Sequence, residues 1–314
     1  LERKEAIRIL HDRERRGLVA GERDFKRVLG GLLVQDRDWD IDDREGMEVA
    51  CGDPDEATWG DLVFAWRVCK HVGSNAIVLA KNLATIEEAY DRALAADPVS
   101  AFGMVCALNR PASRELGERL AERFVDVLYA PGYEPGALEA LRRKAATRIL
   151  LDEERRKPLP GEKDYKRVLG GLLVQDRDWD VEDREGMEVV CGAPSESVWG
   201  DLLFAWRVCK HVNSNAIVIA KDLQTIGIGG GQTSRVDAVR LALEKAREHG
   251  HELKGAVLAS DAFFPFPDGP QAAVDAGVSA IIQPGGSIRD ADVTAAVEAA
   301  GATMVLTGRR HFRH

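Results

Sequence analysis

Two segments in the second half of the chain carry residue types that suit anion or ligand binding. Residues 227–235 read Gly-Ile-Gly-Gly-Gly-Gln-Thr-Ser-Arg, and their backbone amides could hold an anion at a helix N-terminus, with Arg235 beside it. The alternative is a flexible turn in which Ser234 caps the following helix. Residues 260–269 place three phenylalanines and two acids in one loop. Aromatic walls around a carboxylate suit a planar ligand that carries an amine, although the rings could equally cap the core.

Two further segments share this character. Residues 283–290 contain two glycines before an expected helix start, and residues 308–314 are basic with two histidines. An ordinary turn and a solvated tail are the alternatives. All four segments follow expected strands, and α/β sheets collect their sites at the carboxyl ends of strands. Their coincidence therefore favours a ligand site.

The apolar pattern of the sequence predicts the helices and strands that carry these segments. Helical periodicity occurs at 61–71, 113–124, 234–248, 270–276 and 290–300, and short apolar runs suited to buried strands occur at 76–80, 103–108, 125–129, 255–259, 280–282 and 304–306. The helix and strand of 61–80 recur within 201–220. Strands that alternate with helices predict an α/β layered fold.

An internal repeat organises the chain. Residues 1–86 align without a gap on residues 141–226, with about three-quarters of the positions identical. The order of copy, unique segment, copy and unique segment predicts two lobes of one fold, residues 1–140 and 141–314. Weaker echoes join 97–102 with 260–264 and 129–132 with 282–285. A recent duplication, a laboratory fusion or a computed consensus would each explain so high an identity.

Composition excludes several classes of protein. The 314 residues carry a formal net charge of −9 spread along the chain, so neither a nucleic-acid partner nor a membrane surface is indicated. The opening residues contain no apolar signal segment, which together with the cysteines predicts a cytoplasmic protein. The five cysteines form no C-x-x-C pair, so neither a disulfide framework nor a zinc site is expected. The zinc-deaminase signature and the G-x-S-x-G hydrolase elbow are both absent from the sequence.

Several of these motifs together resemble the AICAR (aminoimidazole carboxamide ribonucleotide) transformylase domain of the bifunctional purine biosynthesis family. They are 210–218 (Lys-His-Val-Asn-Ser-Asn-Ala-Ile-Val), 227–235, 259–266 (Ala-Ser-Asp-Ala-Phe-Phe-Pro-Phe), 282–290 (Ile-Gln-Pro-Gly-Gly-Ser-Ile-Arg-Asp) and 310–314 (Arg-His-Phe-Arg-His). The resemblance covers essentially all of 87–314. It implies two cytidine-deaminase-like lobes in tandem without zinc, and a homodimer with sites at the subunit interface. The implied reaction transfers a formyl group from the co-substrate 10-formyltetrahydrofolate to the 5-amino group of AICAR. No counterpart of the family's IMP cyclohydrolase domain is expected in these 314 residues.

The resemblance also assigns roles to individual positions. Nucleotide contacts or pocket walls are implied at Asn215, Arg235, Phe263, Asp268, Arg310, Gly103 and Asp126, a folate-side position at Phe102, and a functional terminal histidine at His314. The amine of AICAR is conjugated with its carboxamide and is a weak nucleophile. An enzyme must therefore remove its proton, hold two ligands in register and stabilise the developing oxyanion. A fixed arginine suits the 5′-phosphate.

One departure from the family pattern bears on catalysis. The family's first lobe carries a Lys-His pair followed by Asn-Pro-x-Gly, and that histidine is its expected proton acceptor. Residues 76–85 instead continue the copied sequence, with Lys81 about one residue from the expected place. Lys70-His71 corresponds to the helix end at Lys210-His211 and is interpreted as structural. Formyl transfer would then rest on Asn215 with Lys81 or His314, with turnover impaired. The alternative is a non-catalytic nucleotide-binding protein or an engineered two-lobe structural protein.

Overall fold

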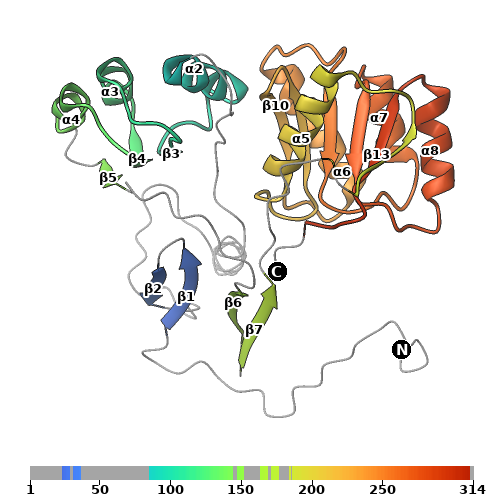
Figure 1. Ribbon diagram of the computed structural model, residues 1–314, viewed down its shortest axis with the longest axis horizontal. Helices are drawn as coiled ribbons and strands as arrows, with labels where there is room; N and C mark the ends of the chain where they lie inside the picture. The colour runs from blue at the N-terminus through green and yellow to red at the C-terminus, as the bar shows by residue number, and fades with distance from the viewer. Residues whose placement is uncertain are drawn as a thin grey trace, which may run out of the picture. The chain divides into compact units, whose positions relative to one another are not determined.

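The computed structural model describes residues 23–28, 31–36, 85–143, 147–151, 163–168, 171–176, 184 and 186–311. Parallel strands alternate with helices in it, which confirms the α/β class (Figure 1). The helix expected at 61–71 and the strand expected at 76–80 lie outside the described residues.

A six-stranded sheet forms the centre of the C-terminal body, which comprises residues 186–311. Its strands, in the order β10-β9-β11-β12-β13-β8, are β10 (Gln224–Gly229), β9 (Ile217–Lys221), β11 (Val257–Ser260), β12 (Ala280–Gln283), β13 (Thr303–Leu306) and β8 (Glu188–Cys191). Strands β11, β12 and β13 are parallel, whereas β9 is antiparallel to both β10 and β11. The carboxyl ends of β10 to β13 and the amino end of β9 therefore meet at one edge, called the carboxyl edge below.

Helices cover both faces of this sheet. They are α5 (Glu196–Cys209) on one face and α6 (Arg235–Glu248), α7 (Asp268–Asp275) and α8 (Asp290–Ala299) on the other. Ile217 and Ile219 of β9 pack with α6 to α8, while Val218 and Ala220 pack with α5. Because both faces are buried, the central strands have continuous apolar sequences, which is why the apolar runs predicted β11, β12 and β13.

Strand β10 corrects the interpretation of residues 227–235 as one glycine-rich loop. Gly227 and Gly229 lie within β10, which packs on α6. A Cβ atom on Gly227 would lie 2.1 Å from the carbonyl oxygen of Ala242, and one on Gly229 would lie 2.0 Å from that of Ala238. These two glycines therefore permit close contact between strand and helix, and the loop is confined to residues 230–234.

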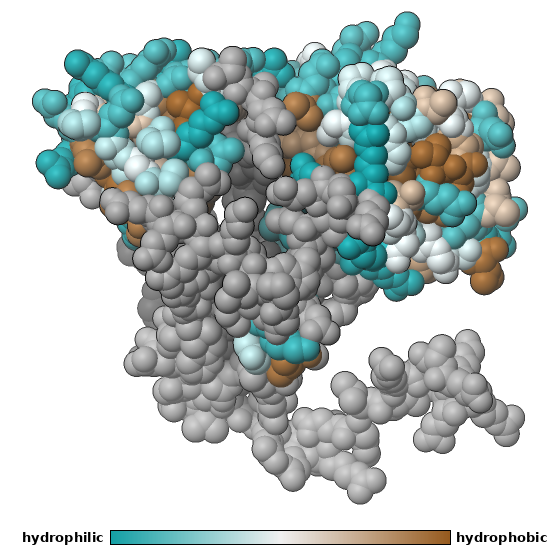
Figure 2. Space-filling view, in the orientation of Figure 1, coloured by the Kyte–Doolittle hydropathy of each residue, from teal (hydrophilic) through white to brown (hydrophobic). Residues whose placement is uncertain are grey.

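The N-terminal body, residues 85–143 with 147–151, contains a three-stranded parallel sheet and three helices. They are β3 (Met104–Ala107), β4 (Val125–Ala130), β5 (Arg148–Leu151), α2 (Ile86–Ala96), α3 (Arg114–Ala121) and α4 (Pro135–Leu141). Met104, Leu116 and Leu128 are buried in one core, and hydrophilic side chains predominate on the face of this body that Figure 2 shows. The side chains of Thr85 and Ser113 cap α2 and α3.

Both bodies contain the same β-α-β-α-β unit, β3-α3-β4-α4-β5 in one and β11-α7-β12-α8-β13 in the other. The echo between 129–132 and 282–285 falls at the carboxyl end of the middle strand in each unit. The echo between 97–102 and 260–264 does not coincide in this way, because 97–102 precedes β3 whereas 260–264 begins at the end of β11.

The two copies of the repeat each form an antiparallel hairpin that the apolar pattern did not predict. The hairpins pair β1 (Arg23–Val28) with β2 (Gly31–Asp36) and β6 (Lys163–Val168) with β7 (Gly171–Asp176). Their registers are identical when shifted by the repeat offset: Val28 faces Gly31 in one, and Val168 faces Gly171 in the other. Charged residues throughout β1 and β6 hide the alternation that marks a strand.

Within the described part of the chain, every helix is too short or too polar to cross a membrane.

Candidate functional site at the carboxyl edge

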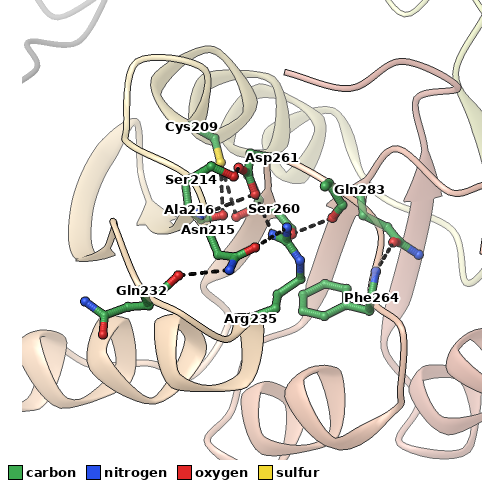
Figure 3. Close-up of polar contacts among 12 residues, drawn as sticks. Cys209, Ser214, Asn215, Ala216, Gln232, Arg235, Ser260, Asp261, Phe264 and Gln283 are labelled. Atoms are coloured by element: carbon green, nitrogen blue, oxygen red, sulfur yellow. Dashed lines mark hydrogen bonds and ion pairs between the residues drawn. The ribbon is translucent and has the colours of Figure 1, made fainter. Parts of the chain in front are cut away.

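A buried ion pair between Arg235 and Asp261 lies at the centre of the carboxyl edge (Figure 3). The side chains are 9% and 3% exposed, and Nη1 of Arg235 donates to Oδ1 of Asp261 at 2.5 Å. The same nitrogen donates to Oγ of Ser260 at 2.8 Å. Arg235 is the first residue of α6, and Asp261 follows the last residue of β11, so the pair joins a helix start to a strand end.

Asn215 is held against this ion pair just before β9. Its Oδ1 accepts from Nη2 of Arg235 at 2.9 Å, and its Nδ2 donates to the carbonyl oxygen of Gln232 at 2.9 Å. The neighbouring Ser214 donates through its hydroxyl to Oδ2 of Asp261, and the backbone N–H of Ala216 donates to Oδ1. The orientation of the Asn215 amide is thus set by partners on both of its polar atoms.

The aromatic loop after β11 divides into a buried and an accessible part. Phe264 is 1% exposed and packs in the core between the sheet and α6 to α8, as the core-capping alternative expected. Phe263 is half-buried, and the guanidinium of Arg310 lies 4.8 Å from its ring centroid. This cation–π contact presents an exposed arginine on an aromatic face beside Asp261.

The chain after β13 is anchored to the same centre. The backbone N–H of His311 donates to the carbonyl oxygen of Asp261 at 3.1 Å, and its ring lies 3.8 Å from that of Trp206. His311 is buried, whereas Arg309 and Arg310 are exposed. The basic residues before 311 are therefore held at the carboxyl edge, which disfavours the solvated-tail alternative for this part.

The glycine turn after β12 is shaped by the first residue of α8. Oδ2 of Asp290 accepts from the backbone N–H groups of Gly286 at 2.6 Å and Ser287 at 3.1 Å. The turn leaves Ile288 fully exposed and places Arg289 over the ring of Phe266, 5.0 Å from its centroid. The loops after β11 and β12 therefore both carry exposed apolar or cationic groups.

Ser234 acts as the cap that the alternative interpretation of residues 227–235 expected. Its Oγ accepts from the backbone N–H of Asp237 at 3.2 Å and donates to the carboxylate of Asp237 at 2.5 Å. Asp237 also puts a negative charge in the first turn of α6. The first turn of this helix is thus capped, and its helix dipole is balanced, by groups of the protein itself.

Among the described residues, the other expected site positions take no part in the hydrogen bonds of this ion pair. Gly103 and Phe102 precede β3, and Asp126 is the second residue of β4, so these three lie toward the amino ends of their strands. Phe102 is 81% exposed with its ring 5.1 Å from that of Phe124, and Asp126 is ion-paired with Arg148. In the C-terminal body, Asp268 is exposed at the first turn of α7 and accepts from the N–H of Gly269. Lys81 and His314 lie outside the described residues.

The thiol of Cys209 is buried next to this centre, against the carbonyl oxygens of Ala216 and Ala259. Burial raises the pKa of the Cys209 thiol well above its usual value, and the charge of Asp261 raises it further, which disfavours the thiolate form. Among the described residues, no group of three or more histidine, cysteine or acidic side chains could hold a metal ion.

Several polar residues that point into the protein and bond one another were not predicted from the sequence. Asp261 was one of two acids expected to face a ligand, but its carboxylate is turned into the protein. Ser214, Ser260 and Gln232 were not singled out. The sequence did contain one signal, the pair Ser260-Asp261 at the end of an apolar strand. A charged side chain at the end of a buried strand requires a partner of opposite charge.

Comparison with known proteins agrees with the motifs. A model of the AICARFT/IMPCHase bienzyme family matches residues 1–86 and 82–245. Proteins named bifunctional purine biosynthesis protein PurH are similar to the chain. The one from Chlorobium phaeobacteroides is 47% identical over 232 residues, 73% of this chain and 44% of the relative. That from Cereibacter sphaeroides is 49% identical over 239 residues (74% and 45%), and that from Anaeromyxobacter dehalogenans is 46% identical over 264 residues (81% and 50%).

The chain spans about half the length of the curated relatives it matches. The family match itself extends over more than half of the chain. Together with the motifs gathered at the carboxyl edge, it shows that this chain belongs to the AICARFT/IMPCHase bienzyme family.

Proposed function

We propose that the chain binds AICAR and transfers a formyl group to its 5-amino group from 10-formyltetrahydrofolate, as a step of purine biosynthesis. The observation that supports this most directly is the carboxyl edge of the C-terminal body. There Asn215 bonds Arg235 of the buried ion pair, Phe263 and Arg310 contact each other, and the residue after Arg310 bonds the carbonyl oxygen of Asp261. The family resemblance implies all three of the positions Asn215, Phe263 and Arg310.

Each of these groups suits part of the substrate. Arg310 is exposed and can pair with the 5′-phosphate, and Phe263 offers an aromatic face to the imidazole ring. Asn215 can hydrogen-bond a polar group on that ring. Asp268 lies at the end of the same aromatic loop, where it could receive the substrate's amine. Arg235 is occupied by Asp261, Ser260 and Asn215, so it supports substrate binding through Asn215.

The folate is proposed to use the N-terminal body. Phe102 and Phe124 present exposed rings close to Gly103, which suits the flat pteridine. We further propose that residues 1–140 and 141–314 form two cytidine-deaminase-like lobes. The β-α-β-α-β unit common to the two bodies supports a shared fold, and its last strand in the N-terminal body, β5, comes from residues after 140. A homodimer would bring groups from two subunits together at each site. Its test is sedimentation with and without AICAR, where a monomer in both would refute it.

The buried, unpaired Cys106, Cys191 and Cys209 are compatible with a cytoplasmic protein.

The proposed reaction needs a group that removes a proton from the amine of AICAR. The family's Lys-His pair is missing around residues 80–85, so Lys81 or His314 must assist the reaction, and turnover is expected to be slow. The test is an AICAR-dependent and folate-dependent formylation assay on the chain, repeated after grafting Lys-His-Asn-Pro-x-Gly across Ala80–Thr85. We expect a gain of about two to four orders of magnitude, the usual contribution of a positioned general base.

The second candidate function, nucleotide binding without turnover, is favoured by the same missing pair. Calorimetry with AICAR separates the two candidates. Binding with no formylation, before and after the graft, would establish the binding protein and refute the enzyme. Absence of AICAR binding to the chain would refute both.

A further inference from the structure

The buried ion pair between Arg235 and Asp261 also holds the side-chain amide of Asn215. We propose that Asp261 is a positioning residue, which acts through Arg235 and Ser214 to make Asn215 present an N–H donor, and not a carbonyl acceptor, to the bound ligand. This inference rests on the proposed function only for the identity of that ligand.

The first step is the burial of the charges. At 3% exposure, the Asp261 side chain is shielded from water, and its carboxylate accepts from three groups: the Arg235 guanidinium, the Ser214 hydroxyl and the Ala216 N–H. Removing one member of a buried ion pair leaves the other charge uncompensated. Asp261 therefore determines where Arg235 lies.

The second step is the amide of Asn215. Arg235 has only donors, so the atom of Asn215 that faces it must be the oxygen. The structure agrees, because Oδ1 accepts from Nη2 and Nδ2 donates to the carbonyl oxygen of Gln232. Nδ2 carries two hydrogens, and one of them remains for a ligand once Gln232 has taken the other. The ligand atom at this place is then an acceptor, such as a carboxamide or phosphate oxygen.

The third step concerns the segment that carries Asn215. Asp261 bonds both neighbours of Asn215, through the side chain of Ser214 and the N–H of Ala216, and Asp261 N–H donates back to the carbonyl oxygen of Ala216 at 3.2 Å. The carbonyl oxygen of Asp261 also accepts from His311, next to Arg310. One buried acid thus ties together the asparagine and the segment of the phosphate-binding arginine.

The experiment compares Asp261→Asn with a matched control, Asp201→Asn. Asp201 is also buried in the C-terminal body, and its carboxylate accepts from the N–H groups of Asp222 at 2.9 Å and Leu223 at 2.7 Å. That turn joins β9 to β10 at the edge opposite the carboxyl edge. Both variants lose a buried carboxylate, but only Asp261→Asn disturbs Asn215.

Two readouts are taken from the same samples. The Asn215 side-chain amide signals in a ¹H–¹⁵N spectrum, assigned with Asn215→Ala, report the amide's environment without any ligand. Calorimetry reports the AICAR dissociation constant. We expect Asp261→Asn to move the Asn215 signals and weaken AICAR binding about tenfold or more, the size expected for a lost hydrogen bond to a charged group. Asp201→Asn should lower thermal stability and leave both readouts unchanged.

A second variant covers the case in which Asp261→Asn does not fold. Arg235→Lys keeps a positive charge for Asp261 but cannot also bond Asn215 through a second nitrogen. It should give the same shift of the Asn215 signals. Unmoved Asn215 signals in both folded variants, or equal weakening by Asp201→Asn, would overturn the proposal. If the wild-type chain does not bind AICAR, the proposed function fails, and the Asn215 signals still decide whether Asp261 positions this amide.

Discussion

Replacing Gly227 by alanine is expected to destabilise the C-terminal body strongly, because this glycine lies where strand β10 contacts helix α6. The new Cβ would lie 2.1 Å from the carbonyl oxygen of Ala242, and ordinary contact begins near 3.4 Å, so strand and helix must separate by about 1.3 Å. The obstructing atom belongs to a helix backbone and cannot rotate away.

Overpacking of this kind destabilises by about 1–3 kcal/mol. We expect about 3 kcal/mol here, because the backbone of a whole helix must move. For a domain of this size that corresponds to a fall in Tm of roughly 10 °C. Urea unfolding followed by circular dichroism measures the change in the free energy of unfolding, and calorimetry measures the Tm.

The matched control is Gly231→Ala. Gly231 has a φ of 67°, and its added Cβ would meet no atom within 4 Å. Only the left-handed backbone then opposes alanine, which amounts to about 1–2 kcal/mol. If Gly227→Ala changes stability by less than about 0.5 kcal/mol, or no more than Gly231→Ala does, the packing argument is refuted. A loss of phosphate affinity at unchanged stability would instead restore Gly227 to an anion-binding loop.

Three further outcomes follow from the described residues. Burial raises the pKa of Glu87, but hydrogen bonds, chiefly from the Ser113 hydroxyl, outweigh it and leave the pKa below its usual value. Glu87 therefore adds stability above its unfolded pKa and loses it as pH falls through the lower folded value. The stability difference between wild type and Glu87→Gln should shrink from about pH 6 to about pH 3 in urea titrations, and a constant difference would contradict this. Ile281→Ala, at a fully buried position, should lower the free energy of unfolding by about 2–5 kcal/mol, whereas Ile288→Ala, fully exposed, should change it by less than about 0.5 kcal/mol. Burial raises the pKa of Cys106 to about 12, so this thiol should stay unmodified at about pH 8 until the protein is denatured; rapid labelling of Cys106 in the native protein, located by peptide mass, would contradict its burial.

Apolar pattern alone predicted the central elements well. Val257–Ser260, Ala280–Gln283 and Thr303–Leu306 are strands because both of their faces are buried, and such burial leaves continuous apolar runs in the sequence. Helix α6 was equally clear, with Ser234 as its cap. These elements are encoded by local composition, so no knowledge of their neighbours was needed.

Strand β10 could not be predicted in the same way. Its glycines have low strand propensity, and Gln224–Gly229 forms a strand because β9 pairs with one side of it and α6 packs on its face. The N-terminal body gives a second example, since β5 contains the exposed Leu150 and Leu151 and is defined by its parallel pairing with β4. In both cases the partner, and not the local sequence, selects the strand.

The residue types that gather at the carboxyl edge follow from the order of strands and loops along the chain, because strands of one direction end at the same side of a sheet. The resemblance gave Asn215, Phe263 and Arg310 as positions that contact the nucleotide or shape its pocket. The folded chain shows in addition that Arg235 faces inward to Asp261 while Arg310 stays exposed on Phe263. A buried charge needs an opposite charge beside it, and this pairing joins residues that are distant in the chain, so local sequence does not reveal it.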